Sequence, residues 1–137
     1  ILNNALLAFD QTFAGTYAGV ISGTGALAKT GAGTVTLSGA NTFSGSTTIS
    51  AGTLRVTSGS ALSDTGAVVL ADVAGATLDL AGSAGTIGSL AGGGATGGNV
   101  ALGAGGALTV GGAGTSTTYA GAISGAGYLT KTGAGTL

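Results

Sequence analysis

The sequence contains no histidine, cysteine, methionine, tryptophan, proline or glutamate, and only seven of its 137 residues carry a charge. Proton transfer near neutral pH usually depends on histidine or a tuned glutamate, and a nucleophile needs a neighbouring base. The available bases are four separated aspartates and two lysines. We therefore expect that the chain is not an enzyme and that it has no catalytic, cofactor-binding or metal-binding residues.

The composition also excludes several non-enzymatic classes. Glycine occurs 31 times, as in flexible linkers, but disordered chains combine low hydrophobicity with high net charge. This chain is 44% hydrophobic and has a formal net charge of −1, so we expect it to fold around a narrow core. A net charge near zero provides no basic stripe for nucleic acid. No run of about 18 apolar residues predicts a membrane-spanning helix.

Internal similarity is the strongest signal in the sequence. The twenty residues from Thr16 to Val35 return from Thr118 to Leu137, with fifteen identities at an offset of 102 and no gap. A shorter signature recurs between the two copies. It consists of an apolar, a polar and an apolar residue, and it follows Gly-Thr, Ala-Thr or Gly-Ala. Its first apolar residues are Val35, Leu54, Leu78, Leu108 and Leu137. Their spacing predicts four coils of about 25 residues between the copies, and about five coils in all.

The signature has the alternation of a strand that buries one face. The residues expected to point inward, stacked as one ladder, include Leu54, Leu78 and Leu108. The residues expected to face solvent are Arg55, Asp79 and Thr109. Further short strands are predicted at 47–50, 67–70, 86–90 and 99–102.

Glycine and short strands together favour a parallel β-solenoid. Coils stacked about 4.8 Å apart pair every backbone group with a neighbouring coil, and glycine supplies the corners. The run from Gly92 to Gly98 predicts a loop that bulges from one corner of the longest coil. No segment has the period of an amphipathic helix, so the expected class is all-β.

Two positions conflict with simple alternation. Lys29 shares the parity of Leu27, and a lone buried ammonium is costly. We therefore predict a corner at Lys29-Thr30-Gly31 that turns this side chain outward, and the same for Lys131. At the start of the chain, side-chain size favours Leu7 and Phe9 as inward residues, whereas the repeat offset favours Leu6 and Ala8.

The stretch from Gly25 to Val56 closely resembles the autotransporter-associated β-strand repeat of passenger domains in type V secretion. The similarity recurs in part at 127–137, and 3–23 resembles the strand pair that commonly precedes such a repeat. Residues 57–117 are similar only in style. The resemblance implies a right-handed parallel β-helix without catalytic residues. It also implies export through an outer-membrane translocator barrel at the end of the same chain, and a role of the repeat in export and folding.

The chain ends also bear on its context. Residues 1–9 have no basic region and include Asn3 and Asn4, unlike a signal peptide. The chain stops within the signature at Leu137, and neither end has the polar cap that a solenoid needs. We expect 1–137 to be a single solenoid segment, an interior excerpt of a longer chain.

Several patterns imitate functional sites. Gly92, Gly94 and Gly97 have dinucleotide-binding spacing, but no helix follows them. Asp64 and Asp72 are too few for calcium, which needs six or more oxygen ligands. Thr34 and Thr36 resemble an ice-binding array, yet later coils do not continue it. The aromatic residues in a shared motif are expected to pack, with a sugar-binding platform as the alternative; they are Phe13, Tyr17, Phe43 and Tyr119.

The favoured function is a structural stalk of an extracellular or cell-surface bacterial protein that assists passenger secretion and folding. One alternative is an adhesin surface that binds host or neighbouring cells. Another is a self-associating filament subunit, because both ends of a solenoid expose unpaired strand edges. A catalytic domain elsewhere in the parent chain is a further alternative. No cofactor and no nucleic-acid partner is expected.

Overall fold

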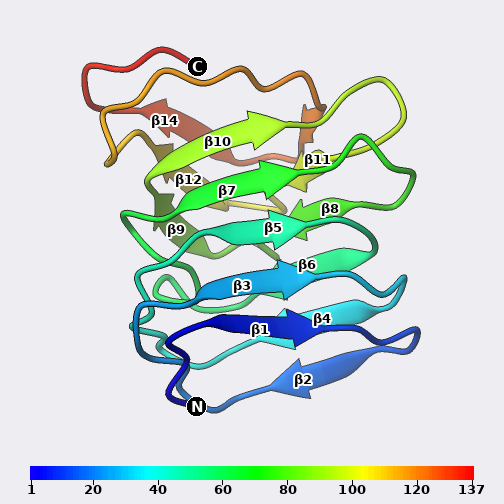
Figure 1. Cartoon of the computed structure of the whole chain (residues 1–137). Coiled ribbons are helices and arrows are strands. Elements are labelled where there is room, and N and C mark those ends of the chain that lie inside the picture. Colours follow the sequence, from blue (N-terminus) through cyan, green and yellow to red (C-terminus); the bar gives the residue numbers. More distant parts are fainter.

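The computed structural model describes residues 1–137 as a stack of coils that contains fourteen strands and no helix. Each coil passes along three sides, and successive coils rise in a right-handed sense from the N-terminal to the C-terminal end (Figure 1). The strands pair in parallel throughout, in three sheets of five, six and three strands. The predicted all-β, right-handed parallel β-solenoid is confirmed, and its count of about six coils is close to the five expected.

The sheets correspond to the three sides of the solenoid. The first sheet contains β1 (Leu6–Phe9), β3 (Ala26–Lys29), β5 (Thr47–Ile49), β7 (Ala67–Leu70) and β10 (Ser89–Gly92). The second sheet contains β2 (Gly15–Tyr17), β4 (Thr34–Leu37), β6 (Thr53–Val56), β8 (Thr77–Asp79), β11 (Asn99–Ala101) and β13 (Ile123–Ser124). The third sheet contains β9 (Ala84–Ile87), β12 (Ala107–Val110) and β14 (Tyr128–Lys131).

The third side is irregular in the first coils. There the chain makes an isolated bridge between Leu2 and Ser22 and single hydrogen bonds such as Thr42 N–H to Ile21 C=O, at 2.8 Å. A regular sheet begins on this side only with β9. The solenoid therefore has two complete sheets along its length and a third that starts partway up (Figure 1).

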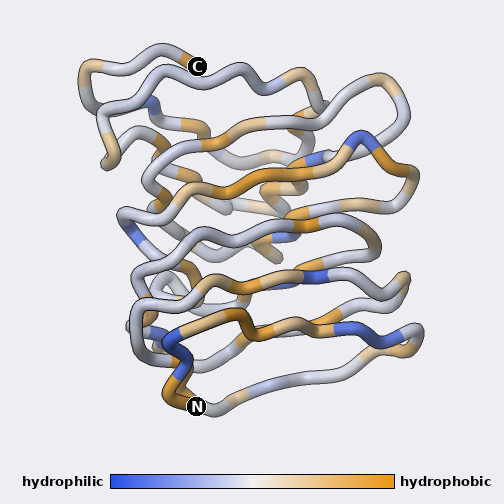
Figure 2. Tube along the Cα trace, viewed as in Figure 1, coloured by the Kyte–Doolittle hydropathy of each residue, from blue (hydrophilic) through white to orange (hydrophobic).

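The core is a column of aliphatic side chains between the three sides. On the second sheet, Val35, Leu54, Leu78 and Val100 stack in register and are almost fully buried. The apolar colour in Figure 2 accordingly lies mainly along the strands, while most of the corners are paler or polar. Alternation within each short strand thus generates a continuous core when the coils are stacked.

The predicted single ladder was wrong beyond Leu78. Leu54, Leu78 and Leu108 are all buried, as expected, but Leu108 lies on the third sheet, in register with Gly85 and Leu129. Leu137 lies in no strand and is 40% exposed. The signature specifies only a strand with one buried face, so it can occur on more than one side of the solenoid. Because successive signatures do not always lie on the same side, the spacing between them is not the length of a coil, and the predicted coil length of about 25 residues was an average over both cases. Registered partners in adjacent coils are 19 residues apart at Thr34 and Thr53, and 27 at Gly92 and Tyr119.

The two long sequence copies occupy different sides. Tyr17 lies in β2 of the second sheet, whereas Tyr119 bridges Gly92 at the end of the first sheet. Likewise, Lys29 belongs to β3 of the first sheet and Lys131 to β14 of the third. The repeat offset is therefore not a whole number of coils.

The expected strand at 86–90 is two strands. A corner at Gly88 separates β9 from β10, so these residues contribute to two sheets. Elsewhere the expected strands match β5, β7 and β11 to within one residue. The glycine-rich run forms a corner loop between β10 and β11, as expected. The coil that contains this loop is not unusually long, because its registered residues on the second sheet, Leu78 and Val100, are 22 residues apart.

Lys29 corrects a second prediction. The strand β3 continues through it, in register with Phe9 and Ile49, and its side chain is fully buried. The corner begins one residue later. The ammonium is accommodated because its Nζ donates hydrogen bonds to the carbonyl oxygens of Gly31 and, at 3.3 Å, of Ala51. Burial among carbonyl dipoles replaces part of the lost hydration.

The other ambiguous positions follow side-chain size. Leu7 and Phe9 pack against the core, while Leu6 is 64% exposed. The predicted outward corner at Lys131 was wrong as well, because β14 continues through this residue in register with the buried Val110; the side chain is nevertheless exposed. Its position is an inward one on the outermost strand of the third sheet.

Candidate functional site

The residue types that most often bind metal ions do not gather anywhere in the molecule. No group of three Asp, Glu, His or Cys side chains lies together. Asp64 and Asp72 flank β7 at its opposite ends, so they cannot share one ion. Asp72 instead accepts hydrogen bonds from the backbone N–H groups of Thr96 and Gly97, at 2.8 and 2.9 Å.

The glycine-rich loop is built by close backbone stacking. Within this loop, the N–H groups of Thr96 and Gly97 donate hydrogen bonds to Asp72. A Cβ atom at Gly97 would lie 1.8 Å from the carbonyl oxygen of Val73 in the coil below. The strand β11 follows directly, where a dinucleotide site would need a helix N-terminus. The glycines therefore allow one corner to stack on the corner below.

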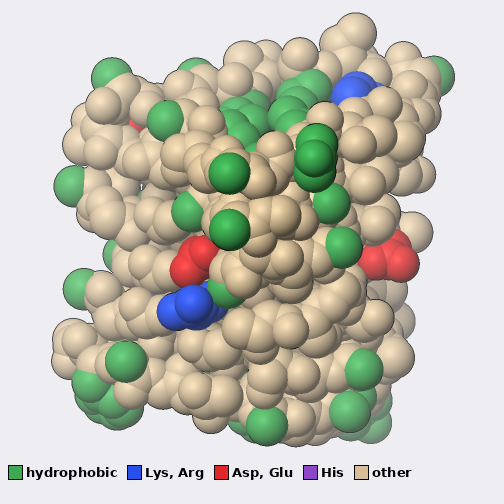
Figure 3. Space-filling view, turned by 180° about the vertical axis from the view of Figure 1, so that it is seen from behind, with side chains coloured by type: hydrophobic (Ala, Val, Ile, Leu, Met, Phe, Trp, Pro, Cys, Tyr) green, Lys and Arg blue, Asp and Glu red, His purple; other side chains and the backbone are tan.

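The outer face of the second sheet carries a polar column that interrupts any threonine grid. Thr36, Arg55 and Asp79 are in register, and Arg55 forms an ion pair with Asp79, Nε to Oδ2, at 3.5 Å. Figure 3 shows few charged side chains on the rear surface of the molecule, which is largely neutral. This surface offers no concentrated charge to a partner.

The four motif aromatics have different surroundings. Phe43 is buried in the core, Tyr17 and Tyr119 pack against it from partly buried positions, and Phe13 is 70% exposed. The Tyr119 hydroxyl donates a hydrogen bond to the carbonyl oxygen of Gly98 at 2.7 Å. Burial raises the pKa of Tyr119, against the smaller opposing effect of a backbone hydrogen bond. The rings do not form one platform.

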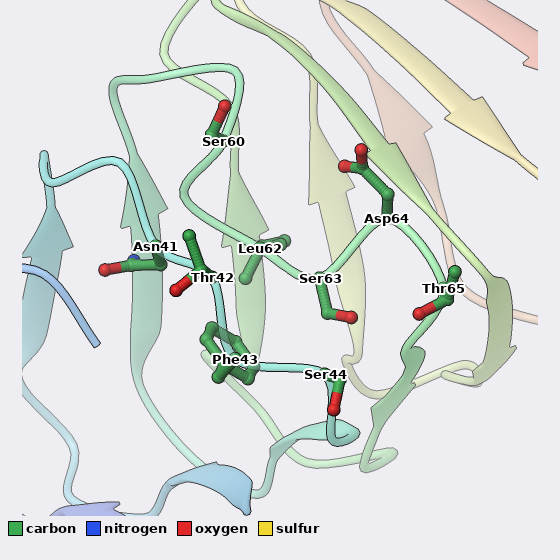
Figure 4. A pocket seen from close by; sticks show the side chains of 9 residues that line it. All are labelled: Asn41, Thr42, Phe43, Ser44, Ser60, Leu62, Ser63, Asp64 and Thr65. Carbon is green, nitrogen blue, oxygen red and sulfur yellow. The ribbon is translucent and has the colours of Figure 1, made fainter. Parts of the chain in front are cut away.

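The molecule has one pronounced hollow, a groove of about 270 Å³ on its third side. Figure 4 shows that two segments form it, with Asn41 and Thr42 at one side and Asp64 and Thr65 at the other. Five lining side chains carry hydroxyls and one carries a carboxylate. The complete lining is Asn41, Thr42, Phe43, Ser44, Ser60, Leu62, Ser63, Asp64 and Thr65.

The groove exists because the hydrogen-bond ladder between two coils opens there. Thr42 and Ser44 donate their N–H groups to Ile21 and Gly23 of the coil below, so the intervening residue faces the coil above. Asn41 begins this upper ladder with a 2.8 Å bond from its N–H to Ser60 C=O. The next bond in register, from Phe43 N–H to Leu62 C=O, is not made, because the chain turns away at Ser63.

Side chains hold both edges of the opening. Asn41 links three coils, since its Oδ1 accepts from Ile21 N–H at 2.9 Å and its Nδ2 donates to Ala61 C=O at 2.8 Å. On the other wall, Ser63 Oγ accepts from Gly66 N–H at 2.9 Å and stabilises the turn. The opening is thus a built feature of the coil.

Backbone groups along the groove have no partner within the chain. The N–H and C=O groups of Phe43, Leu62 and Asp64 make no hydrogen bond to protein. Phe43 is only 3% exposed and Leu62 8%, so these are peptide groups at the floor of a groove and not at a free surface. Nearly all buried peptide groups in proteins are paired with protein, water or a ligand.

The groove was not predicted from the sequence. Asp64 was considered only as a calcium ligand, and Phe43 as a packing residue or as part of a sugar-binding platform. A signal was present, because residues 58–66 lack the apolar alternation that their neighbours have and contain only turn-forming and small polar residues around Ala61 and Leu62.

Right-handed parallel stacking, glycine corners and an aliphatic column define the chain as a β-solenoid of degenerate repeats. Residues 27–56, from β3 through β6, match the family model of the passenger-associated-transport-repeat. Over 133 residues the chain is 46% identical to the adhesin BmaC autotransporter of Brucella suis biovar 1 (strain 1330). That match covers 96% of this chain and 4% of the relative's length. No solved structure matches the chain.

Residues 27–56 therefore carry the repeat of autotransporter passengers, and the chain as a whole is similar to a short part of an autotransporter. The resemblance seen in the sequence is confirmed, and within the matched repeat β3 stacks in register with β5, and β4 with β6. No helix long and apolar enough to cross a membrane is present in the structure.

Proposed function

We propose that the chain is a stalk segment of a surface-exposed passenger, with no catalytic chemistry of its own. The observation that carries this proposal is the register-continuous core, in which Val35, Leu54, Leu78 and Val100 stack from coil to coil. Such a column makes the solenoid a rigid rod along its axis, and the stability of each coil depends mainly on its contacts with the two neighbouring coils. The match to a transport repeat at 27–56 supports an additional role in passenger export through a translocator on the parent chain.

Deleting the segment from the complete passenger tests the stalk role. Six coils at about 4.8 Å each predict that the rod, measured by electron microscopy of displayed passengers, shortens by roughly 25–30 Å. Replacement by six coils of another solenoid should restore the length and surface display. Loss of a binding or catalytic activity that this replacement fails to restore would contradict a purely structural role.

Adhesion is the second candidate, because the curated relative is named as an adhesin. In this case the purified chain should bind host or neighbouring cells saturably, and excess unlabelled chain should compete. The largely neutral surface predicts that such binding depends weakly on salt (Figure 3). Absence of saturable binding would contradict the adhesion role.

A further inference from the structure

We propose that the groove between Phe43 and Asp64 binds an extended peptide segment that carries a basic side chain. Both walls of this groove carry unpaired peptide groups. Phe43 presents an N–H and a C=O towards the opening, and Leu62 and Asp64 on the opposite wall also have main-chain groups without partners. An added strand pairs with main-chain groups of this kind when it extends a sheet edge.

The register explains why a strand fits this place. Asn41 N–H pairs with Ser60 C=O, and the ladder opens at the very next bond. The walls therefore diverge from a paired end, which leaves about 270 Å³ between the main chain at Phe43 and the turning segment 60–65. An incoming strand would continue the interrupted ladder from the Phe43 wall.

The lining selects the chemistry of the occupant. Asp64 is the single charged residue among the nine that line the groove, and it is exposed. A lysine or arginine side chain on the bound segment complements it, and the hydroxyls elsewhere in the lining can accept further hydrogen bonds from the segment. A glycan fits less well, because the single aromatic ring of the lining, Phe43, is 3% exposed and presents no stacking face.

Titration of the ¹⁵N-labelled 137-residue chain with a probe peptide tests the proposal. The probe is acetyl-Ser-Thr-Lys-Thr-Ser-amide, compared with a version in which glutamate replaces lysine and with a version N-methylated at alternate peptide groups. We expect saturable amide shifts at Phe43 and at 62–65 with millimolar affinity. The glutamate probe should bind roughly three- to tenfold more weakly, and the N-methylated probe should not bind.

Two variants separate charge selection from general electrostatics. Asp64→Asn should remove the preference for the lysine probe over the glutamate probe. Asp79→Asn removes the same charge from the second sheet, outside the groove lining, and should leave the preference unchanged. The three probe peptides are also compared on the unaltered chain, so the test does not depend on the stability of any protein variant.

Three results would overturn the proposal. The first is the absence of shifts at these amides at saturating probe, which would leave a solvent-filled groove. The second is equal binding of the N-methylated probe, which would exclude main-chain pairing. The third is that chitotetraose, and not the peptide, shifts the same amides, which would make the groove a glycan site. None of these results bears on the stalk role.

Discussion

Lys29 is the charged residue that the core encloses, and its environment makes stability depend on pH. Burial lowers the pKa of its ammonium below 10.5, and attraction to Asp10 opposes this only in part. Between the lowered value and 10.5 the unfolded chain binds more protons than the folded chain, so the free energy of unfolding rises as pH increases through this window. Below the window both states are protonated and the contribution is constant.

We expect urea denaturation at a series of pH values to show this rise for the wild type and not for Lys29→Met. The methionine variant should fold, because an apolar side chain of similar length avoids the cost of burying a charge. Lys131→Met is the control. Since Lys131 is exposed, this variant should retain the wild-type dependence. Parallel pH profiles for the wild type and Lys29→Met would contradict the assignment.

Leu78 and Asp79 test the alternation of the second sheet at adjacent residues. Leu78 is 0% exposed, and truncation to alanine leaves a cavity in the column. Leu78→Ala should therefore lower the free energy of unfolding by about 2–5 kcal/mol. Asp79→Ser should cost no more than about 1 kcal/mol, because its ion pair with Arg55 is partly exposed and a serine hydroxyl can still accept from Ala81 N–H. Equal midpoints in urea would contradict the assignment of Leu78 to the inward face and Asp79 to the outward face.

At the scale of strands and corners, two glycines provide a matched comparison. A Cβ at Gly97 would lie 1.8 Å from the carbonyl oxygen of Val73, whereas a Cβ at Gly85 in β9 would meet nothing within 4 Å. Gly97→Ala should force the stacked corners apart and lower the thermal midpoint clearly. Gly85→Ala should raise stability by up to about 1 kcal/mol, because it restricts the unfolded chain and adds a methyl group opposite Leu108. Equal effects of the two substitutions would mean that corner stacking is loose.

The strands could be predicted from the sequence because each is a local pattern. Alternation places Leu54, Leu78 and Leu108 inward without reference to the rest of the chain. The side of the solenoid to which a strand belongs is not local. It depends on how many residues each corner takes up, and so the signature at Leu108 was assigned to the ladder of Leu78 when it lies on another sheet.

The groove and the contacts of the buried lysine were not predicted for a related reason. Both depend on carbonyl groups of neighbouring coils. The Ala51 C=O that accepts from Lys29 belongs to the next coil, and the opening at Phe43 exists because Leu62 does not complete the ladder above it. Sequence spacing specifies neither partner, since coil length varies along the chain.

For the whole molecule, the stacked arrangement predicts that coils can be removed from one end. The strand β13 pairs only with β11, and β14 only with β12, so the last coil is held by a single neighbour. Stability of such a solenoid is close to a sum of coil and interface contributions. Deleting 112–137 should leave a β-rich circular dichroism spectrum and a cooperative transition with a lower urea midpoint.

The same deletion uncovers Val100, Leu108 and Val110, each at most 1% exposed in the intact chain. Sedimentation velocity should therefore detect self-association of the shortened chain through its apolar, unpaired end. Deletion of 133–137 alone is the control. It removes no strand and should leave the midpoint and the sedimentation profile close to those of the intact chain. If loss of 112–137 instead unfolded every coil, stability would be a property of the entire stack, and the stalk could not gain or lose coils without losing its fold.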